Sequence, residues 1–183
     1  RPVLTKAIDQ LAVFMRYSIS LKENYVPLAK EVQQLEAYVY LQKLCCGDEL
    51  NVVVDIDEAL MEFLTVKLML QPLVENAVMH GRKSDGAVLN ILIYSYDDAQ
   101  DYYLVVEDDG CGMEKDKIAE VFDEMNQQQY HGYGLKNIIR RLEICSGGSS
   151  SLSIESEKDI YTKIVIRQKK TRENFSGTDG RAK

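Results

Sequence analysis

The 183-residue chain has no tryptophan, only three prolines and no long apolar run. Its longest apolar stretches have five residues, as in 11–15, whereas a helix needs about twenty apolar residues to cross a bilayer. We therefore predict no membrane-spanning segment within these residues. A secretory signal peptide is also lacking, because Arg1 to Leu4 lead directly into an amphipathic pattern. Since the first residue is not Met, we expect a piece of a longer protein, with any membrane segments in the missing part.

The chain also lacks the residue clusters that hold structural zinc or a disulfide framework. Its four cysteines form no Cys-x-x-Cys pair, and only two histidines could join them. Reduced thiols in a cytosolic protein are therefore expected. The 22 Lys and Arg residues against 29 Asp and Glu residues give a net charge of −7. Because nucleic-acid binding favours a basic surface, we expect no nucleic-acid partner.

The first fifty residues have the periodicity of two helices. Apolar residues from Leu4 to Met15 recur at alternating spacings of four and three, and the pattern repeats from Leu28 to Cys46. This spacing produces a narrow apolar seam, which is typical of helices that pair in bundles. Pro27 suits the first turn of the second helix, and Gly47 ends it. The two helices are expected to form a hairpin, to pack across a dimer axis, or only to pad the next domain.

From Leu50 onward, strands alternate with helices. Predicted strands cover 51–56, 88–96, 102–107, 151–157 and 160–168, and predicted helices cover 58–81 (interrupted by Pro72), 115–122 and 135–145. This order predicts an α+β fold, a two-layer sandwich of a mixed β-sheet and helices preceded by two helices. The predicted divisions are partial dimerisation or linker helices at 1–47, the main domain at 48–168 and a disordered tail at 169–183.

The first of three polar segments, 74–81, lies late on a predicted helix. Asn76 and His80 are four residues apart and so share one helix face. An amide oxygen is a hard ligand that suits Mg²⁺, and an imidazole one turn further on can reach a phosphate. A hydrogen-bonded core Asn with a helix-terminal His is the alternative, which this segment alone favours.

The second segment, Asp108 to Met113, follows a predicted strand. Gly110 and Gly112 allow a sharp bend and a close approach of the backbone to a flat ligand. A carboxylate at the strand end can accept a hydrogen bond from an exocyclic amine such as adenine N6. A plain turn is the alternative. An EF-hand calcium loop is excluded, because position twelve counted from Asp108 is Ala119 rather than Glu.

The third segment, 131–138, opens a predicted helix with Gly132 and Gly134. Glycines at a helix N-terminus expose backbone N–H groups, where the helix dipole favours an anion. Lys136 lies in the first turn, where the dipole alone disfavours a cation, so its position is better explained with a phosphate present. The segment is neither a Walker A loop nor a Rossmann fingerprint. An ordinary junction between a loop and a helix is the alternative.

Together, the three segments resemble the ATP-binding domain of sensor histidine kinases of the LytS/YesM type, within the gyrase, chaperone, kinase and MutL (GHKL) ATPase superfamily. Leu70–Gly81 is similar to the N box of these kinases, Asp108–Met113 to their G1 box and Gly132–Ile138 to their G2 box. Residues 14–17 and 28–42 resemble the stretch that links the phosphoacceptor helix to the ATP domain. The resemblance spans roughly residues 7–168 and implies the GHKL (Bergerat) ATP-binding fold.

The resemblance also implies roles for single residues, with ATP and Mg²⁺ as cofactors. Asp108 would hold the adenine amine, Asn76 would bind Mg²⁺, and Glu75 would orient water or assist proton transfer as the catalytic residue. The other residues implied to bind the nucleotide are His80, Gly110, Gly112, Gly132, Gly134, Leu135, Lys136 and Thr162. Residues 114–130 would form a lid over the nucleotide.

The sequence departs from the pattern of these kinases at three points. Met79 stands where a basic residue often precedes the N-box His, and Tyr161 stands where a Gly usually precedes the late Thr. The phosphoacceptor His, which lies in a Pro-His-Phe type motif, is absent from this chain. The only histidines are His80 and His131, and both lie in the ATP-binding boxes.

The resemblance thus implies the cytoplasmic catalytic portion of a two-component sensor histidine kinase in a bacterial inner membrane. It would transfer the γ-phosphoryl group of Mg·ATP to a histidine outside this chain. The implied partners are a response regulator and, for the full-length protein, a second copy. One alternative is a GHKL-type ATPase, although Pro72 stands where such enzymes carry a general-base Glu. The other is a regulatory module that only binds nucleotide or a partner.

Overall fold

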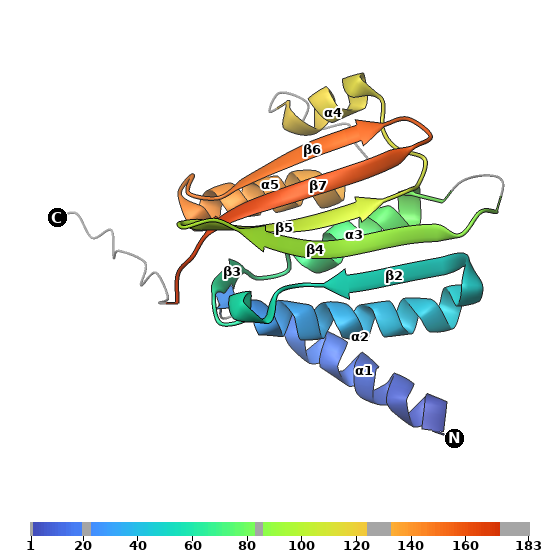
Figure 1. Ribbon diagram of the computed structural model, residues 1–183. Helices are drawn as coiled ribbons and strands as arrows, with labels where there is room; N and C mark the ends of the chain where they lie inside the picture. The colour runs from blue at the N-terminus through green and yellow to red at the C-terminus, as the bar shows by residue number, and fades with distance from the viewer. Residues whose placement is uncertain (1, 20–22, 83–85, 124–132, 173–183) are drawn as a thin grey trace.

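The computed structural model describes residues 2–19, 23–82, 86–123 and 133–172 (Figure 1). The elements, in chain order, are α1 (Pro2–Ile19), β1 (Tyr25–Pro27), α2 (Leu28–Cys46), β2 (Leu50–Asp55), β3 (Leu64–Val66), α3 (Leu70–His80), β4 (Leu89–Asp97), β5 (Asp101–Asp108), α4 (Lys115–Phe122), α5 (Tyr133–Ser146), β6 (Ser151–Glu157) and β7 (Tyr161–Lys169). Two short 3₁₀ turns lie at Gly47–Glu49 and Glu58–Leu60.

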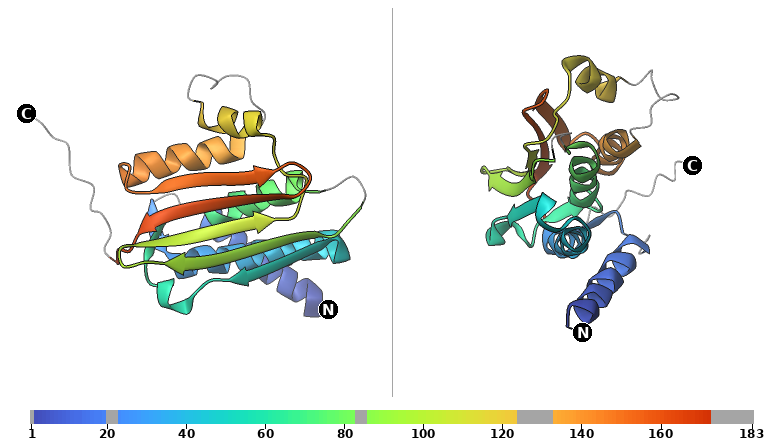
Figure 2. Two further views of the ribbon diagram at one scale, coloured as in Figure 1. Left: turned by 45° about the horizontal axis from the view of Figure 1, so that its top comes forward. Right: turned by 90° about the vertical axis from the view of Figure 1, so that its right-hand side faces the viewer.

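The sheet and the helices packed on it form two layers, as the sequence predicts. A five-stranded sheet with the order β2-β4-β5-β7-β6 forms one layer, and α2, α3 and α5 cover one face of it (Figure 2). Strand β2 pairs with β4 in parallel and the other neighbours pair antiparallel, so the sheet is mixed. The α+β sandwich with two preceding helices is therefore confirmed.

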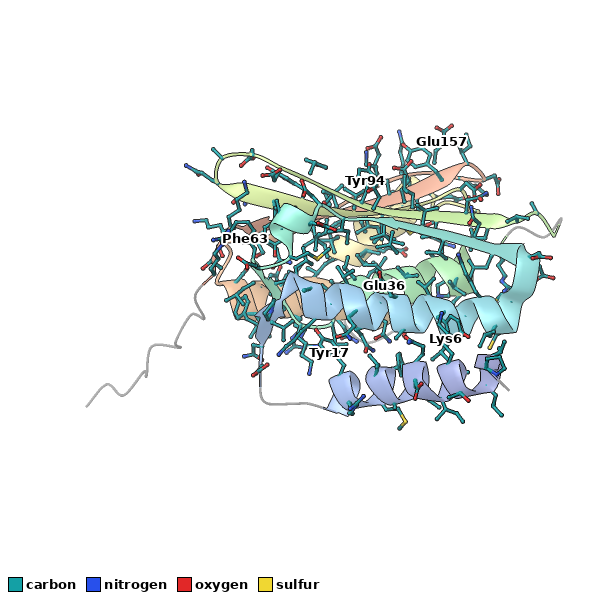
Figure 3. The ribbon with its side chains drawn as sticks, turned by 60° about the horizontal axis from the view of Figure 1, so that its bottom comes forward. Lys6, Tyr17, Glu36, Phe63, Tyr94 and Glu157 are labelled. Carbon is teal, nitrogen blue, oxygen red and sulfur yellow. The ribbon has the colours of Figure 1, made fainter. Side chains whose placement is uncertain are left out.

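Side chains along the strands alternate between the face that packs on the helices and the opposite face. Ile91, Ile93 and Leu104 point into the helical layer and are at most 1% exposed. Side chains on the other face are more exposed, as Val53 is at 47% and Leu92 at 41%, although Val105 is buried; Tyr94 lies on this face in Figure 3. One apolar core fills the space between the layers, because residues two apart on a strand share a face. The inner faces of β5 and β7 support the candidate site described below.

The predicted helix over 58–81 is wrong in its first half. Residues 58–60 form a 3₁₀ turn, in which the Asp57 side chain accepts a hydrogen bond from the Ala59 N–H at 2.8 Å. Residues 64–66 form β3, which pairs antiparallel with β1. This pairing with a distant segment overrides the local helical periodicity, and the helix begins only at Leu70.

The predicted tail also begins too early. Lys169 is the last residue of β7, and the Lys170 N–H donates to the Gln100 carbonyl at 2.9 Å. The Thr171 carbonyl accepts from the Leu64 N–H at 2.8 Å. Residues 169–172 thus continue the domain, and the rest of the predicted tail, 173–183, lies outside the described residues.

Helix α1 packs on α2 with one face and leaves its apolar seam on the other. The Phe14 and Tyr38 rings stack with centroids 6.3 Å apart, and Lys6 Nζ lies 4.6 Å from the centroid of the Tyr40 ring. The seam residues Leu4, Ile8, Leu11 and Met15 are 67%, 58%, 46% and 51% exposed. The helices therefore form a hairpin, but the predicted seam does not hold it together. Among the described residues, no helix combines the length and apolar character required to cross a membrane.

Candidate functional site

A pocket of about 610 Å³ opens between α3, α4, the start of α5, the end of β5 and the start of β7. This volume is within the usual range for sites that bind small molecules. The predicted site residues that line it are Asn76, His80, Asp108, Gly112, Leu135, Lys136 and Thr162. Segments more than 80 residues apart in sequence therefore meet at one place.

Asp108 ends β5 and is only 6% exposed. Its Oδ1 accepts a hydrogen bond from the Gly110 N–H at 3.0 Å, which fixes the carboxylate against the turn that follows. The neighbouring Asp109 lies outside this pocket. Its carboxylate instead accepts from the backbone N–H of Asn90 at 2.8 Å and from its side-chain amide at 2.7 Å. The Asp108 carboxylate therefore lines the pocket, whereas the Asp109 carboxylate binds to Asn90 in the sheet.

The glycines around Asp108 allow backbone segments to touch. A Cβ on Gly110 would lie 2.3 Å from the Gly81 carbonyl oxygen, and the Cys111 N–H donates to that same oxygen at 3.0 Å. Gly112 has φ +58°, and a Cβ there would lie 2.0 Å from the Glu157 carbonyl oxygen. Side chains at these positions would separate α3, β5 and the β6–β7 turn, so glycine is required for the pocket to close.

Asn76 lies on α3 in van der Waals contact with the start of α5. A Cβ on Gly134 would lie 2.7 Å from both Nδ2 and Oδ1 of Asn76, so only glycine leaves room for this amide. Nδ2 is buried and has no hydrogen-bond partner among the described residues. Because an unpaired buried donor is costly, this amide is suited to donate to an acceptor atom of a ligand.

Other predicted residues lie around the mouth of the pocket or beside it. His80 lines the pocket with an exposed side chain. Glu75 does not line it, and its Oε1 accepts from Gln71 Nε2 at 2.6 Å. Gly132 lies outside the described residues, as does the second half of the predicted lid. The first half of that lid contains α4, which contributes Lys117 to the wall.

The β6–β7 hairpin holds one side of the pocket through a residue that sequence reasoning missed. Ser156 Oγ accepts from the Met113 N–H at 2.8 Å, donates to the Tyr161 carbonyl at 2.6 Å and lies 3.1 Å from Thr162 Oγ1. It thereby fixes Thr162, which is 8% exposed, beside the turn after β5. No motif contains Ser156, and only its pairing opposite Thr162 in the hairpin reveals it.

An ion pair fastens α4 to the same hairpin. Lys158 Nζ lies 2.5 Å from Glu114 Oε1, directly before the first turn of α4. Hydrogen bonding to Lys158 lowers the pKa of the Glu114 carboxyl, so this pair stays charged near neutral pH. Helix α4 adds the side chains of Lys117, Glu120 and Val121 to the pocket, and this exposed ion pair links the residue before the helix to the hairpin.

The pocket combines an apolar slot with polar groups at both ends. Leu73, Ala77, Val106 and Ile164 form the apolar walls. The Asp108 carboxylate, an acceptor, is at the buried end with 6% exposure, and the Asn76 amide and the Lys136 cation belong to less buried residues of the lining. No group of three or more His, Cys, Asp or Glu side chains in the described ranges could hold a metal ion. The arrangement suits a flat ligand with a hydrogen-bond donor at one end and anionic groups at the other.

Comparison with known proteins identifies two regions. Residues 62–172 match the family described as histidine kinase-, DNA gyrase B- and HSP90-like ATPase, and residues 2–50 match the histidine kinase family. The chain is similar to a sensor-like histidine kinase of Staphylococcus epidermidis (31% identity over 156 residues, 84% of this chain and 30% of that protein). It is also similar to the sensor protein kinase HptS of Staphylococcus aureus (28% over 162 residues, 87% and 31%).

Among solved structures, the catalytic domain of histidine kinase ThkA has a TM-score of 0.61 at 16% identity. The match covers 81% of this chain and 99% of that domain. At this identity the likeness concerns the fold alone. The chain spans about three tenths of the length of the two staphylococcal relatives.

The glycine contacts predict that alanine destabilises the protein more at Gly112 than at Gly147, although the two glycines have nearly the same φ angle. Gly112 and Gly147 have φ +58° and +57°, but only the Cβ of Gly112→Ala would meet another atom within 4 Å. Both variants bear the cost of a left-handed alanine, about 1–2 kcal/mol. Gly112→Ala should lower the free energy of unfolding by roughly a further 1–3 kcal/mol, as measured by urea denaturation. Equal losses in the two variants would contradict the close backbone contact at Gly112.

Proposed function

The chain belongs to the family of histidine kinase-, DNA gyrase B- and HSP90-like ATPases, and we propose that it uses Mg·ATP to phosphorylate a histidine outside this chain. Its main domain is a histidine kinase catalytic domain, homologous to those of sensor kinases. One observation carries the proposal: every described residue of the predicted nucleotide set except Gly110 and Gly134 lines a single pocket, and Gly134 lies against the Asn76 side chain. Gly110 lies directly behind the pocket, bonded to Asp108.

The adenine of ATP is assigned to the inner end of the pocket. Asp108 is buried there and presents a carboxylate, which can accept a hydrogen bond from the adenine N6 amine. Val106 and Ile164 offer apolar surface to the flat ring, and Thr162 adds a hydroxyl at the pocket edge. Tyr161, where related kinases usually have Gly, does not line this pocket; neighbouring residues on a strand point to opposite faces, and its hydroxyl donates to Glu155 Oε1 at 2.8 Å.

The phosphates are assigned to the mouth, where Asn76, His80 and Lys136 lie. The residues fit Mg²⁺ if the metal arrives with the nucleotide, since Mg²⁺ takes few protein ligands and several phosphate or water oxygens. The amide oxygen of Asn76 would be the protein ligand. Bound there, Mg²⁺ would neutralise charge on the phosphates, while Lys136 and the first turn of α5 would hold the phosphate oxygens.

Phosphoryl transfer needs little reactive chemistry from the protein. A nitrogen of the acceptor imidazole forms a bond to the γ-phosphorus, the bond from that phosphorus to the bridging oxygen breaks, and ADP leaves. Glu75 lies beside the pocket rather than in its wall, and we assign it the proton that the acceptor imidazole releases. Pro72 lies one turn before Asn76 on α3 and has no group that could activate water, which favours transfer over hydrolysis.

The partners of the reaction lie outside this chain. The exposed seam of α1, with Leu4, Ile8 and Leu11, is a surface that a second copy of the full-length protein can cover, as in a helical dimer. The phosphohistidine would then pass its phosphoryl group to a response regulator. Attachment to a bacterial inner membrane, with this portion in the cytoplasm, is part of the same proposal and rests on the sensor kinases to which the chain is similar.

The transfer reaction is tested by supplying the missing acceptor. The purified chain is incubated with γ-labelled ATP, Mg²⁺ and a separate helical peptide that carries a histidine. We expect label on the peptide that is lost in acid but stable in base, as for a phosphoramidate, together with negligible release of free phosphate. A peptide with Gln in place of the histidine is the control. Rapid ATP hydrolysis without the peptide would support the ATPase alternative.

Asp108 provides a test of the adenine end. Asp108→Asn retains the size of the side chain but replaces a charged acceptor by a neutral amide. ATP affinity, measured by titration calorimetry, should fall by about 2 kcal/mol, or roughly thirtyfold. The matched control is Asp109→Asn, because Asp109 bonds to Asn90 and lies outside the pocket. Unchanged affinity in Asp108→Asn would refute the assignment of the adenine end.

Asn76 provides a separate test of the metal. Wild-type protein should bind ATP more tightly with Mg²⁺ than with EDTA, and Asn76→Ala should lose most of that difference while retaining the affinity measured in EDTA. The control is Asn137→Ala, because Asn137 is exposed on α5 and does not line the pocket. If Asn76→Ala kept the full Mg²⁺ effect, Asn76 would not be the metal ligand.

A further inference from the structure

Buried polar side chains join three helices beside the pocket. Glu31 and Gln34 on α2 are 2% and 1% exposed, and Gln71 on α3 is 8% exposed. Hydrogen bonds connect them to Tyr17 on α1 and to Glu75 on α3. We call these five residues the α1–α3 bridge. Burying polar groups costs free energy unless they are paired, so their position in the core needs an explanation.

One arm of the bridge runs from the backbone of α1 to Glu75. Gln34 Nε2 donates to the Phe14 carbonyl at 3.3 Å and to Gln71 Oε1 at 3.0 Å. Gln71 Nε2 in turn donates to Glu75 Oε1 at 2.6 Å. The Glu75 carboxylate therefore has its orientation set by an amide, which is itself held by an amide seated under α1.

The other arm holds the start of α3. The Glu31 carboxylate accepts from the backbone N–H groups of Leu68, Met69 and Leu70 at 2.6, 3.0 and 3.3 Å. It also accepts from the Tyr17 hydroxyl, which lies between α1 and α2 (Figure 3). Burial and the nearby Glu31 carboxylate raise the pKa of Tyr17, which therefore stays protonated as the donor.

Filling space is a poor explanation for Gln34. Apolar side chains of similar volume can replace buried polar groups at little or no cost in stability. The Oε1 atom of Gln34 is buried and has no partner in the part of the chain that the structure describes. An amide with half of its hydrogen-bonding capacity unused adds little to stability, but its two donated bonds, one to the Phe14 carbonyl and one to Gln71, fix the Gln71 side chain relative to the backbone of α1.

We propose that Gln34 is a positioning residue, which sets the orientation of the Glu75 carboxylate through Gln71 according to how α1 sits on α2. The inference rests on the proposed function of Glu75 in phosphoryl transfer. It means that a shift of α1 changes the rate of transfer without altering any residue that touches the nucleotide. Tyr17 gives α1 a second connection to α3, through Glu31.

The test compares Gln34→Met with Gln33→Met, the same substitution at the exposed neighbouring position on α2. In the peptide phosphorylation assay, Gln34→Met should lower the rate at saturating ATP about tenfold and leave the KM for ATP unchanged. Its urea midpoint should stay near that of the wild type, because the lost bonds and the removed unpaired oxygen offset each other. Gln33→Met should behave as the wild type in both measurements.

A second readout does not need catalysis. In ¹H–¹⁵N spectra without nucleotide, Gln34→Met and Tyr17→Phe should shift the backbone amide signals of Glu75 and Asn76, whereas Gln33→Met should not. Unchanged signals, an unchanged rate, or a loss of rate that follows a lower urea midpoint would each overturn the proposal. If the wild-type chain transfers no phosphoryl group, the proposed function fails, and the spectra alone decide whether the bridge exists.

Discussion

The first turn of α3 begins inside the protein, where its peptide N–H groups have no water to bond with. Met69 precedes the helix and provides no side-chain cap, and Leu68 is in the left-handed region with φ +59°. Helix ends need such partners, and here the Glu31 carboxylate supplies them from α2. The position of α3, and with it the places of Asn76 and His80 in the pocket, therefore depends on a charge from another helix. Burial raises the pKa of the Glu31 carboxyl above its usual value, although the hydrogen bonds from its four donors partly oppose this shift.

The other end of α3 is held by backbone rather than by charge. The Gly81 carbonyl accepts from the Cys111 N–H and lies against Gly110, so the helix ends directly on the turn after β5. Asp108 is fixed by that same turn. The two ends of α3 thus bring together the Asn76 amide and the Asp108 carboxylate, which are 32 positions apart in the sequence. The apolar sheet face beneath them supplies the wall, and the hairpin with Ser156 closes the side.

Much of this could be predicted, because the relevant constraints are local in sequence. The strands carry β-branched residues in short runs, and Gly112 indicates a close approach of the backbone, which the structure shows against Glu157 of the β6–β7 turn. The short β1–β3 pair could not be predicted, since three-residue strands leave no periodic pattern and their pairing joins Tyr25 to Val66. The start of α3 was misplaced for a similar reason, because its cap is 39 positions away. The sequence could also have indicated that Glu75 and Asn76 do not both face the pocket, since neighbouring residues on a helix point in different directions.

Strand β7 is the last element in the part of the chain that the structure describes, yet it lies between β5 and β6 in the sheet. On a ribosome, where synthesis proceeds from the N-terminus, β6 has no strand to pair with until β7 has emerged, and β5 keeps an open edge. Open edges of this kind attract other strands and promote aggregation. The nucleotide pocket shares this dependence, because Thr162 and Ile164 come from β7. The domain is thus completed by the last few of its residues to be synthesised, and a nascent chain that stops short of them has neither a closed sheet nor a pocket.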